Sequence, residues 1–180
     1  MARNSEIADL GANFPTGHVI QTKYFSTDTA VTSQNTDNTT DSWVDVLTAA
    51  NITMSSQSNK ILILGTGSAA GDAASYEFSW RLVRNIGGGS YSAIGGNSDP
   101  SSLMLSDNVF MSGMSTGEGG QTHSSCFLDT PNTTQEIIYK LQLMSGETST
   151  VYANRGHDTH NVRGWANTGD TNITLMEIQQ

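Results

Sequence analysis

The stretch Thr171-Asn172-Ile173-Thr174-Leu175-Met176-Glu177-Ile178 indicates how the rest of the chain is organised. It contains neither Gly nor Pro and is rich in residues that suit a pleated strand. Its apolar side chains fall on both faces, with Ile173 and Leu175 on one and Met176 and Ile178 on the other. A strand that is apolar on both faces is normally covered on both. We therefore predict that this last strand lies between two earlier strands; the alternative is a frayed strand at a sheet edge.

The composition favours an all-β protein. The chain has 180 residues, which is enough for one domain with a substantial core. Only 14% of the residues are charged, Gly occurs 18 times, and Ser, Thr and Asn are abundant. These residues are typical of turns and polar strand faces rather than of helices.

Charge and cysteine content exclude several classes of protein. The net charge is -9, and the eight Lys and Arg residues are scattered, so we expect no nucleic-acid partner. No stretch reaches the ~20 apolar residues of a membrane helix, so we expect no membrane partner. The single cysteine, Cys126, excludes internal disulfides, and its place in a strand pattern predicts a small buried residue. No apolar run follows Met1–Glu6, so we expect no signal peptide, and synthesis and folding in a cytoplasm.

Segments rich in β-branched and aromatic residues alternate with Gly- or Asn-rich turns along the chain. The predicted strands are 17–25, 42–47, 52–54, 60–64, 76–84, 91–94, 103–111, 123–129, 136–144, 149–154, 162–166 and 171–178. The segments 26–41, 65–75, 95–102 and 113–120 are predicted to be loops. Many short strands without an amphipathic helix predict an antiparallel β-sandwich, and a jelly roll at this length.

Two of these strands alternate most clearly between apolar and polar residues. The period of two places one set of side chains in the core: Tyr76, Phe78, Trp80 and Leu82 from one strand, and Ile137, Tyr139, Leu141 and Leu143 from the other. Apolar residues also occur on the opposite faces, among them Val83, Ile138 and Met144. We expect these outward residues to be buried against neighbouring subunits.

Residues 1–16 read differently from the domain that follows at 17–180. Asn4-Ser5 is suited to cap one helical turn that carries Ile7 and Leu10, and Phe14 comes shortly after it. These apolar residues are too few to form a core. They either fold back on the domain or dock on another chain, and we predict a docking arm anchored by Ile7, Leu10 and Phe14.

No motif in the sequence carries clear chemistry. His157-Asp158-Thr159-His160 offers zinc-type ligands without a third fixed ligand, so we interpret it as a polar loop. Asp37-Asn38-Thr39-Thr40-Asp41 has calcium-type oxygens but lacks the Gly and terminal Glu of an EF-hand loop. Gly65-Thr66-Gly67-Ser68 is followed by neither a Lys nor a helix, so it is no phosphate-binding loop. We expect no enzyme, no cofactor and no metal site.

Three tryptophans, Trp43, Trp80 and Trp165, have two interpretations. Such residues are most often anchors of a core or of a subunit interface. The alternative is that they stack on sugar rings.

Six phrases, taken in order, resemble a known group of proteins. They are Gly17-His18-Val19-Ile20-Gln21, Ser56-Gln57-Ser58-Asn59-Lys60-Ile61-Leu62-Ile63, Phe127-Leu128-Asp129-Thr130-Pro131, Tyr139-Lys140-Leu141-Gln142, Thr150-Val151-Tyr152-Ala153-Asn154-Arg155 and Ile173-Thr174-Leu175-Met176-Glu177-Ile178. Together they resemble a β-sandwich domain of marine bacteriophage virion proteins of the tail-fibre, head-fibre and decoration type. The resemblance spans residues 17–178 and implies a jelly roll of the tumour-necrosis-factor and complement C1q type (TNF/C1q-like), which assembles as a homotrimer.

The resemblance implies a non-enzymatic virion structural protein that is assembled in the cytoplasm of a host bacterium. It would be a homotrimeric capsid decoration or head-fibre protein, or a short tail fibre, attached to other virion proteins by its N-terminal arm. The domain begins about sixteen residues from Met1 with no shaft before it, which favours these over a long fibre. The alternative is a tail-fibre tip that recognises a glycan or protein of the host surface through loops at 65–75 and 113–120.

Overall fold

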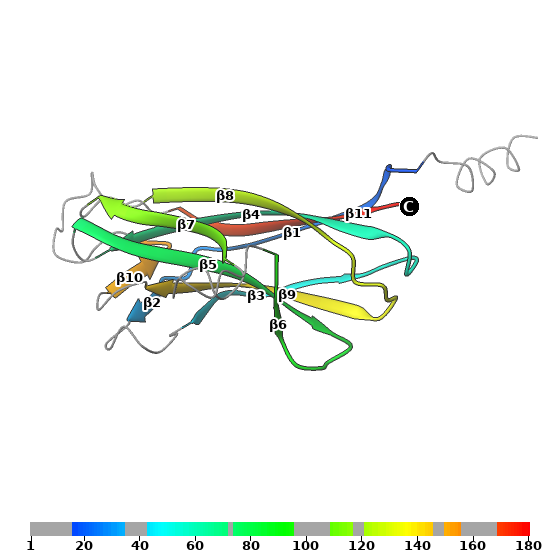
Figure 1. Cartoon of the computed structure of the whole chain (residues 1–180), viewed down its shortest axis with the longest axis horizontal. Helices are drawn as coiled ribbons and strands as arrows, with labels where there is room; N and C mark the ends of the chain where they lie inside the picture. Colours follow the sequence, from blue (N-terminus) through cyan, green and yellow to red (C-terminus); the bar gives the residue numbers. More distant parts are fainter. Residues whose placement is uncertain are drawn as a thin grey trace, which may run out of the picture.

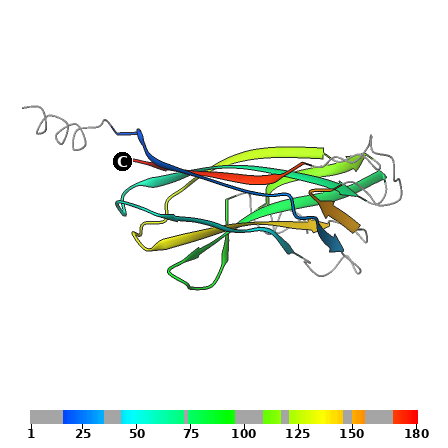
Figure 2. The ribbon, with the colours of Figure 1, turned by 180° about the vertical axis from the view of Figure 1, so that it is seen from behind.

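Two antiparallel β-sheets face each other in the computed structural model (Figures 1 and 2). The structure describes residues 16–34, 43–71, 74–95, 109–116, 121–145, 150–155 and 169–180. All regular elements in these ranges are strands, which confirms the all-β prediction. In chain order they are β1 (Val19–Thr27), β2 (Val31–Gln34), β3 (Val44–Thr53), β4 (Lys60–Gly71), β5 (Ala74–Ile86), β6 (Ser92–Ile94), β7 (Val109–Thr116), β8 (Gln121–Asp129), β9 (Glu136–Ser145), β10 (Thr150–Ala153) and β11 (Thr171–Ile178).

Each sheet has four strand positions, some filled by two short strands in line. In sheet A, β1 and β2 lie at one edge, β11 and β10 come next, then β4, and β8 pairs with the far side of β4. In sheet B the order is β3, β9 and β5, and both β6 and β7 pair with the far side of β5. The chain therefore crosses repeatedly between two interleaved four-position sheets, which is the arrangement of a jelly roll.

The last strand lies inside sheet A, as the sequence predicts. β11 pairs with β1 on one side and with β4 on the other. Ile173 and Leu175 are fully buried in the core, and Met176 and Ile178 are half-buried on the outward face. The two-sided apolar pattern thus identified an internal strand.

The core forms between the inward faces of the two sheets. Phe78, Trp80 and Leu82 from β5 are fully buried there, as are the four inward residues predicted from β9: Ile137, Tyr139, Leu141 and Leu143. A Cβ atom added to Gly67 of β4 would lie 2.7 Å from two ring atoms of Trp80. The indole therefore packs directly on the backbone of β4, at a position where only Gly fits.

This contact explains why the predicted loop at 65–75 is wrong. β4 continues to Gly71, and its small residues face a large side chain of the opposite sheet instead of forming a turn. The loop predicted at 113–120 is wrong in its first part, because β7 extends to Thr116. Residues 117–120 lie outside the described ranges.

Other boundaries also differ from the prediction. The predicted loop at 26–41 contains β2, and the strands predicted at 42–47 and 52–54 are one strand, β3, with two irregularities. The predicted strand at 162–166 lies outside the described residues. Val83 and Met144 face outward from sheet B but are only 3% exposed, so the chain itself buries them and they offer no surface to another subunit. Cys126 is exposed on β8, so its predicted burial is wrong.

Candidate attachment site at the terminal end

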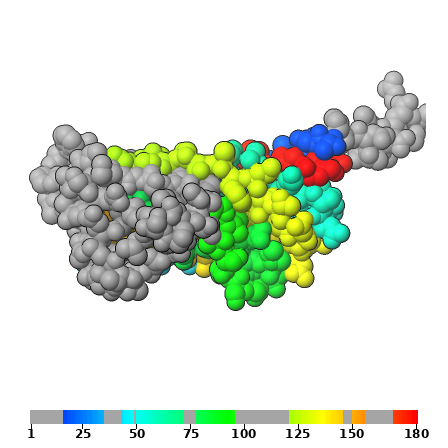
Figure 3. All heavy atoms as spheres, in the orientation of Figure 1, coloured from blue at the N-terminus to red at the C-terminus, as the bar shows by residue number. Residues whose placement is uncertain are grey.

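The two ends of the described chain meet at one end of the sandwich (Figures 1 and 3). The backbone N–H of Gly17 donates to the carbonyl of Gln179 at 2.8 Å, and the N–H of Gln179 donates to the carbonyl of His18 at 3.0 Å. We call this end, where β1 begins and β11 finishes, the terminal end. The predicted anchors Ile7, Leu10 and Phe14 lie outside the described residues, but the chain that carries them joins the sandwich here.

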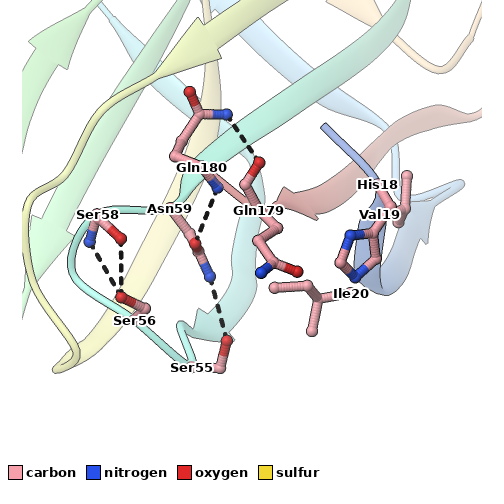
Figure 4. Close-up of a pocket in the computed structure, with 9 residues that line it drawn as sticks. All are labelled: His18, Val19, Ile20, Ser55, Ser56, Ser58, Asn59, Gln179 and Gln180. Atoms are coloured by element: carbon pink, nitrogen blue, oxygen red, sulfur yellow. Dashed lines mark hydrogen bonds between the residues drawn. The ribbon is translucent and has the colours of Figure 1, made fainter. Parts of the chain in front are cut away.

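An open pocket of about 760 Å³ lies at the terminal end (Figure 4). Its walls come from the start of β1, the turn between β3 and β4, and the residues after β11: His18, Val19, Ile20, Ser55, Ser56, Ser58, Asn59, Gln179 and Gln180. Hydroxyl and amide groups dominate this lining, His18 adds an imidazole, and none of these nine residues is Asp, Glu, Lys or Arg. Val19 and Ile20 add apolar surface, being 47% and 39% exposed.

The buried carboxylate of Glu177 supports this pocket. Its Oε1 accepts hydrogen bonds from the backbone N–H of Ser55 at 2.8 Å, from the Ser55 hydroxyl at 2.7 Å and from Asn59 Nδ2 at 2.7 Å. Its Oε2 accepts from Gln21 Nε2 at 2.6 Å. Burial alone would raise the pKa of Glu177, but the bonds from Asn59, Gln21 and Ser55 outweigh it and lower that pKa below its ordinary value.

The donors to Glu177 make further bonds that join three elements. Asn59 Nδ2 also lies 3.2 Å from the Ser55 hydroxyl, and the backbone N–H of Gln180 donates to Asn59 Oδ1 at 3.3 Å (Figure 4). Gln21 Nε2 lies 2.8 Å from the carbonyl of Thr53. The start of β1, the turn after β3 and the end of β11 are thereby fixed to one another. We call these residues (Gln21, Ser55, Asn59 and Glu177) the Glu177 cluster.

A second buried carboxylate, Asp129, lies in the same cross-strand row. The row runs from Gln21 through Glu177 and Ile61 to Asp129. Asp129 accepts from Arg84 Nη1 at 2.6 and 2.7 Å and from the Tyr139 hydroxyl at 2.7 Å. Burial and the neighbouring Asp129 carboxylate raise the pKa of Tyr139 well above its ordinary value. We call Asp129, Arg84 and Tyr139 the Asp129 cluster. It joins β8 of sheet A to β5 and β9 of sheet B.

The outward face of sheet B carries a third polar group. Asp45 binds Lys140 Nζ at 2.6 Å and Gln142 Nε2 at 2.6 Å, and Arg81 Nε donates to Gln142 Oε1 at 2.6 Å. The guanidinium of Arg81 lies 4.4 Å from the centre of the Trp43 ring. Trp43 is therefore a half-buried partner of a cation, whereas Trp80 is the core anchor; Trp165 lies outside the described residues.

The structure does not describe the segments in which metal ligands were considered, at 37–41 and 157–160. Among the residues that it does describe, no group of three or more His, Cys, Asp or Glu side chains could hold a metal ion. No helix in the described ranges is long and apolar enough to cross a membrane.

Sequence reasoning missed both buried carboxylates. Glu177 has the same parity as Ile173 and Leu175, so alternation along β11 already places it on the core side. A carboxylate at such a position requires several donors, and that requirement was the available signal. Asp129 carries no comparable signal, because its partners Arg84 and Tyr139 come from distant strands.

Comparisons with known proteins give the following picture. No protein-family model matches the sequence, and no curated protein matches it. The fold is similar to the CBM22-1 xylan-binding domain from Paenibacillus barcinonensis Xyn10C, with 8% identity, a TM-score of 0.36, and coverage of 93% of this chain and 99% of that one. It is also similar to a chain in the structure of infectious bursal disease virus Gx strain, with 10% identity and a TM-score of 0.40. A chain in the structure of the VP2 subviral particle of infectious bursal disease virus is similar as well, with 11% identity and a TM-score of 0.36.

The chain spans less than half of those viral chains: the matches cover 89% of this chain in both cases but only 41% and 38% of the viral chains. At these identities and TM-scores the similarities assign no function to the chain.

Proposed function

We propose that the protein is a non-enzymatic virion structural protein of bacteriophage type, a homotrimeric capsid decoration or head-fibre protein or a short tail fibre. Its arm, residues 1–16, attaches it to other virion proteins. The observation that carries the proposal is the terminal end, where the arm joins the sandwich beside a pocket whose residues Ser55 and Asn59 are held by Glu177. Because this wall of the pocket is fixed to the sandwich, an anchor bound there would also fix the orientation of the domain.

The chemistry of the terminal end supports binding rather than catalysis. The pocket offers hydroxyl and amide groups and the apolar side chains of Val19 and Ile20. The one carboxylate beneath it, Glu177, already accepts four hydrogen bonds and has its pKa lowered, whereas a general base or acid needs a pKa nearer neutrality.

The jelly-roll strand order and the six phrases that resemble those of virion proteins add support. Five residues of the buried clusters fall within those phrases: Gln21, Asn59, Asp129, Tyr139 and Glu177. The resemblance therefore rests partly on side chains that hold the sandwich together. The receptor-binding alternative has less support, since most of one of its loops and part of the other are strands.

The experiment compares the full chain with a variant carrying Ile7→Ser, Leu10→Ser and Phe14→Ser. Each protein is co-sedimented with particles of the virus that encodes it, prepared without this chain. We expect the variant to keep the wild-type mass and melting temperature and to lose avidity by roughly 10²-fold or more, because three arms act together. Tyr91→Ser, at an exposed position of the domain, is the control and should bind like wild type.

Wild-type occupancy of the triple variant would show that the arm is not the anchor. If the wild-type protein itself fails to bind any part of the particle, the virion assignment is wrong.

A further inference from the structure

The start of β1 carries a bulge that turns two apolar side chains toward solvent. Val19 and Gln21 pair with adjacent residues of β11, so Ile20 between them has no partner on that strand. From Ile20 onward exposed and half-buried residues alternate along β1, but Val19 and Ile20 are both exposed, at 47% and 39%. Bulges are common at sheet edges and beside functional sites, where they change the direction of a side chain. This bulge gives an apolar wall to the open pocket at the terminal end, which we call the terminal pocket.

The wall opposite Val19 and Ile20 is polar and fixed in position (Figure 4). It is the turn at 55–59, in which the backbone N–H of Ser55 and the side-chain amide of Asn59 donate to buried Glu177. The hydroxyls of Ser56 and Ser58 lie 2.9 Å apart. Their mutual bond uses one of their two hydroxyl hydrogens, which leaves the other for a bound group. A wall that is ordered before binding loses little conformational freedom when a ligand arrives.

The lining determines which class of ligand fits between these walls. None of the nine lining residues is Asp, Glu, Lys or Arg, so the terminal pocket offers no permanent charge to a phosphate, a carboxylate or an amine. Neutral sugar rings usually stack on aromatic rings, and the only ring among the nine is the imidazole of His18. The volume of about 760 Å³ lies within the range of roughly 300–1,000 Å³ that is typical of ligand sites.

A short uncharged peptide in an extended conformation satisfies both walls. Its backbone N–H and C=O groups match hydroxyl and amide groups, which can donate and accept hydrogen bonds. An aliphatic side chain of the peptide would remove apolar surface of Val19 and Ile20 from water, which is favourable.

The position of the terminal pocket indicates which protein supplies such a segment. Gly17, the first residue after the arm, donates to the carbonyl of Gln179, and Gln179 lines the pocket. A protein that is held by the arm therefore lies within reach of the pocket. A short tether gives effective concentrations on the order of millimolar, so even a weak contact in the pocket would be occupied.

We propose that the terminal pocket binds an extended, uncharged peptide segment of the same virion protein to which the arm attaches, an inference that rests on the proposed function. An aliphatic side chain of that segment packs on Val19 and Ile20, and its main chain forms hydrogen bonds with the turn at 55–59. The arm is then the tether, and the terminal pocket sets the orientation of the domain on the particle.

The first test repeats the co-sedimentation experiment with a variant that carries Val19→Ser and Ile20→Ser. The probe is the particle prepared without this chain. We expect the variant to keep the wild-type mass and melting temperature and to bind roughly 10–100-fold more weakly, because each aliphatic side chain that is buried on binding contributes up to about tenfold. Tyr91→Ser is the matched control and should bind like wild type, since Tyr91 is 40% exposed and lies outside the terminal pocket.

The second test identifies the occupant and requires no loss of binding. The photoreactive residue benzoylphenylalanine is placed at position 58, which lines the terminal pocket. The control places it at position 57, an exposed position of the same turn that does not line the pocket. Irradiation of decorated particles and mass spectrometry should give a cross-link to an uncharged segment of a virion protein from position 58 and not from position 57. If the serine substitutions lower the melting temperature, this comparison still decides.

Three results would overturn the proposal, and they differ in what else they affect. Wild-type binding by the Val19→Ser and Ile20→Ser variant, together with loss of binding by the arm variant, excludes the terminal pocket and leaves the proposed function intact. A cross-link from position 58 to a second copy of this chain, or to its own arm, assigns the pocket to a contact within the protein itself. If the wild-type protein binds no part of the particle, the proposed function and the inference fail together.

Discussion

Glu177 and Asp129 lie in one cross-strand row of sheet A, on either side of Ile61, but different chemistry holds each buried carboxylate. Among the described residues, the donors to Glu177 are all uncharged: two side-chain amides, one hydroxyl and one backbone N–H. Asp129 is paired with the cation of Arg84 and with the phenol of Tyr139. The Arg84 side chain is 19% exposed, so that ion pair retains some contact with water.

The difference corresponds to what each cluster connects. The Glu177 cluster joins the start of β1, the turn after β3 and the end of β11, and so fixes the terminal end. The Asp129 cluster joins sheet A to β5 and β9 of sheet B, and so holds the two layers together. A buried carboxylate that is held only by neutral protein groups finds no replacement when one of those donors is removed. A carboxylate in an ion pair near the surface can form a hydrogen bond with water instead.

Replacing Glu177 should therefore have the largest effect on stability. Glu177→Ala removes the acceptor for four donors in a buried site and should lower the free energy of unfolding by about 3–5 kcal/mol. Urea denaturation followed by circular dichroism measures this loss. The control, Glu177→Gln, keeps one acceptor oxygen and should cost about half as much. A loss for Glu177→Ala that is smaller than the loss for Asp129→Asn would reverse the comparison.

Replacing Asp129 should have an intermediate effect. Asp129→Asn weakens the bonds to Arg84 and Tyr139 and should lower the free energy of unfolding by about 2–3 kcal/mol. Tyr139→Phe leaves the Arg84 pair intact and should cost about 1 kcal/mol. The same urea experiment compares both variants, and equal losses would show that the ion pair contributes little.

Acid titration should test the Glu177 cluster by a second route. The pKa of Glu177 is lowered in the folded state, so its contribution to stability is complete above the ordinary value of 4.5 and is lost as the pH falls below it. Each such group adds up to about 1.4 kcal/mol per pH unit to the slope. Thermal melts between neutral and acidic pH should give a shallower slope for Glu177→Gln than for wild type. Parallel curves would mean that Glu177 titrates normally.

The partly exposed carboxylate Asp45 should give the smallest effect. It pairs with Lys140 but its side chain is 35% exposed, so Asp45→Asn should lower the free energy of unfolding by less than about 1 kcal/mol. This loss should shrink further in high salt, because exposed pairs are screened. A larger loss that does not depend on salt would place Asp45 with the buried carboxylates.

Local patterns predicted the strands whose residues alternate clearly between the core and the outward face. Alternation in β5, β9 and β11 identified the core residues, and the two-sided pattern of β11 placed it inside a sheet. The small residues at 65–71 were predicted to form a loop, but they belong to β4. Gly67 leaves room there for the indole of Trp80 from the other sheet. No local pattern contains such a contact.

The candidate site could be predicted only in part. Sequence alone indicated an apolar arm before the domain, but not that the start of β1 lies beside Gln179 and Gln180. Bringing residues 17 and 179 together depends on the pairing of β1 with β11 along their whole length. Cys126 was misplaced because β8 is half-buried on one face and exposed on the other. Its short polar neighbours do not reveal on which of the two faces Cys126 lies.

The meeting of His18 and Gln179 has a practical consequence for anyone who fuses a reporter or a displayed peptide to this protein. A tag added after Gln180 starts beside Gly17 and His18, so it would crowd any partner that binds at the terminal end. The hairpin at Gly87 and Gly88, between β5 and β6, offers an exposed position in a separate turn. An insertion after Gly88 extends a turn of sheet B and leaves the hydrogen bonds between Gly17, His18 and Gln179 unaltered, so it is the better position for cargo.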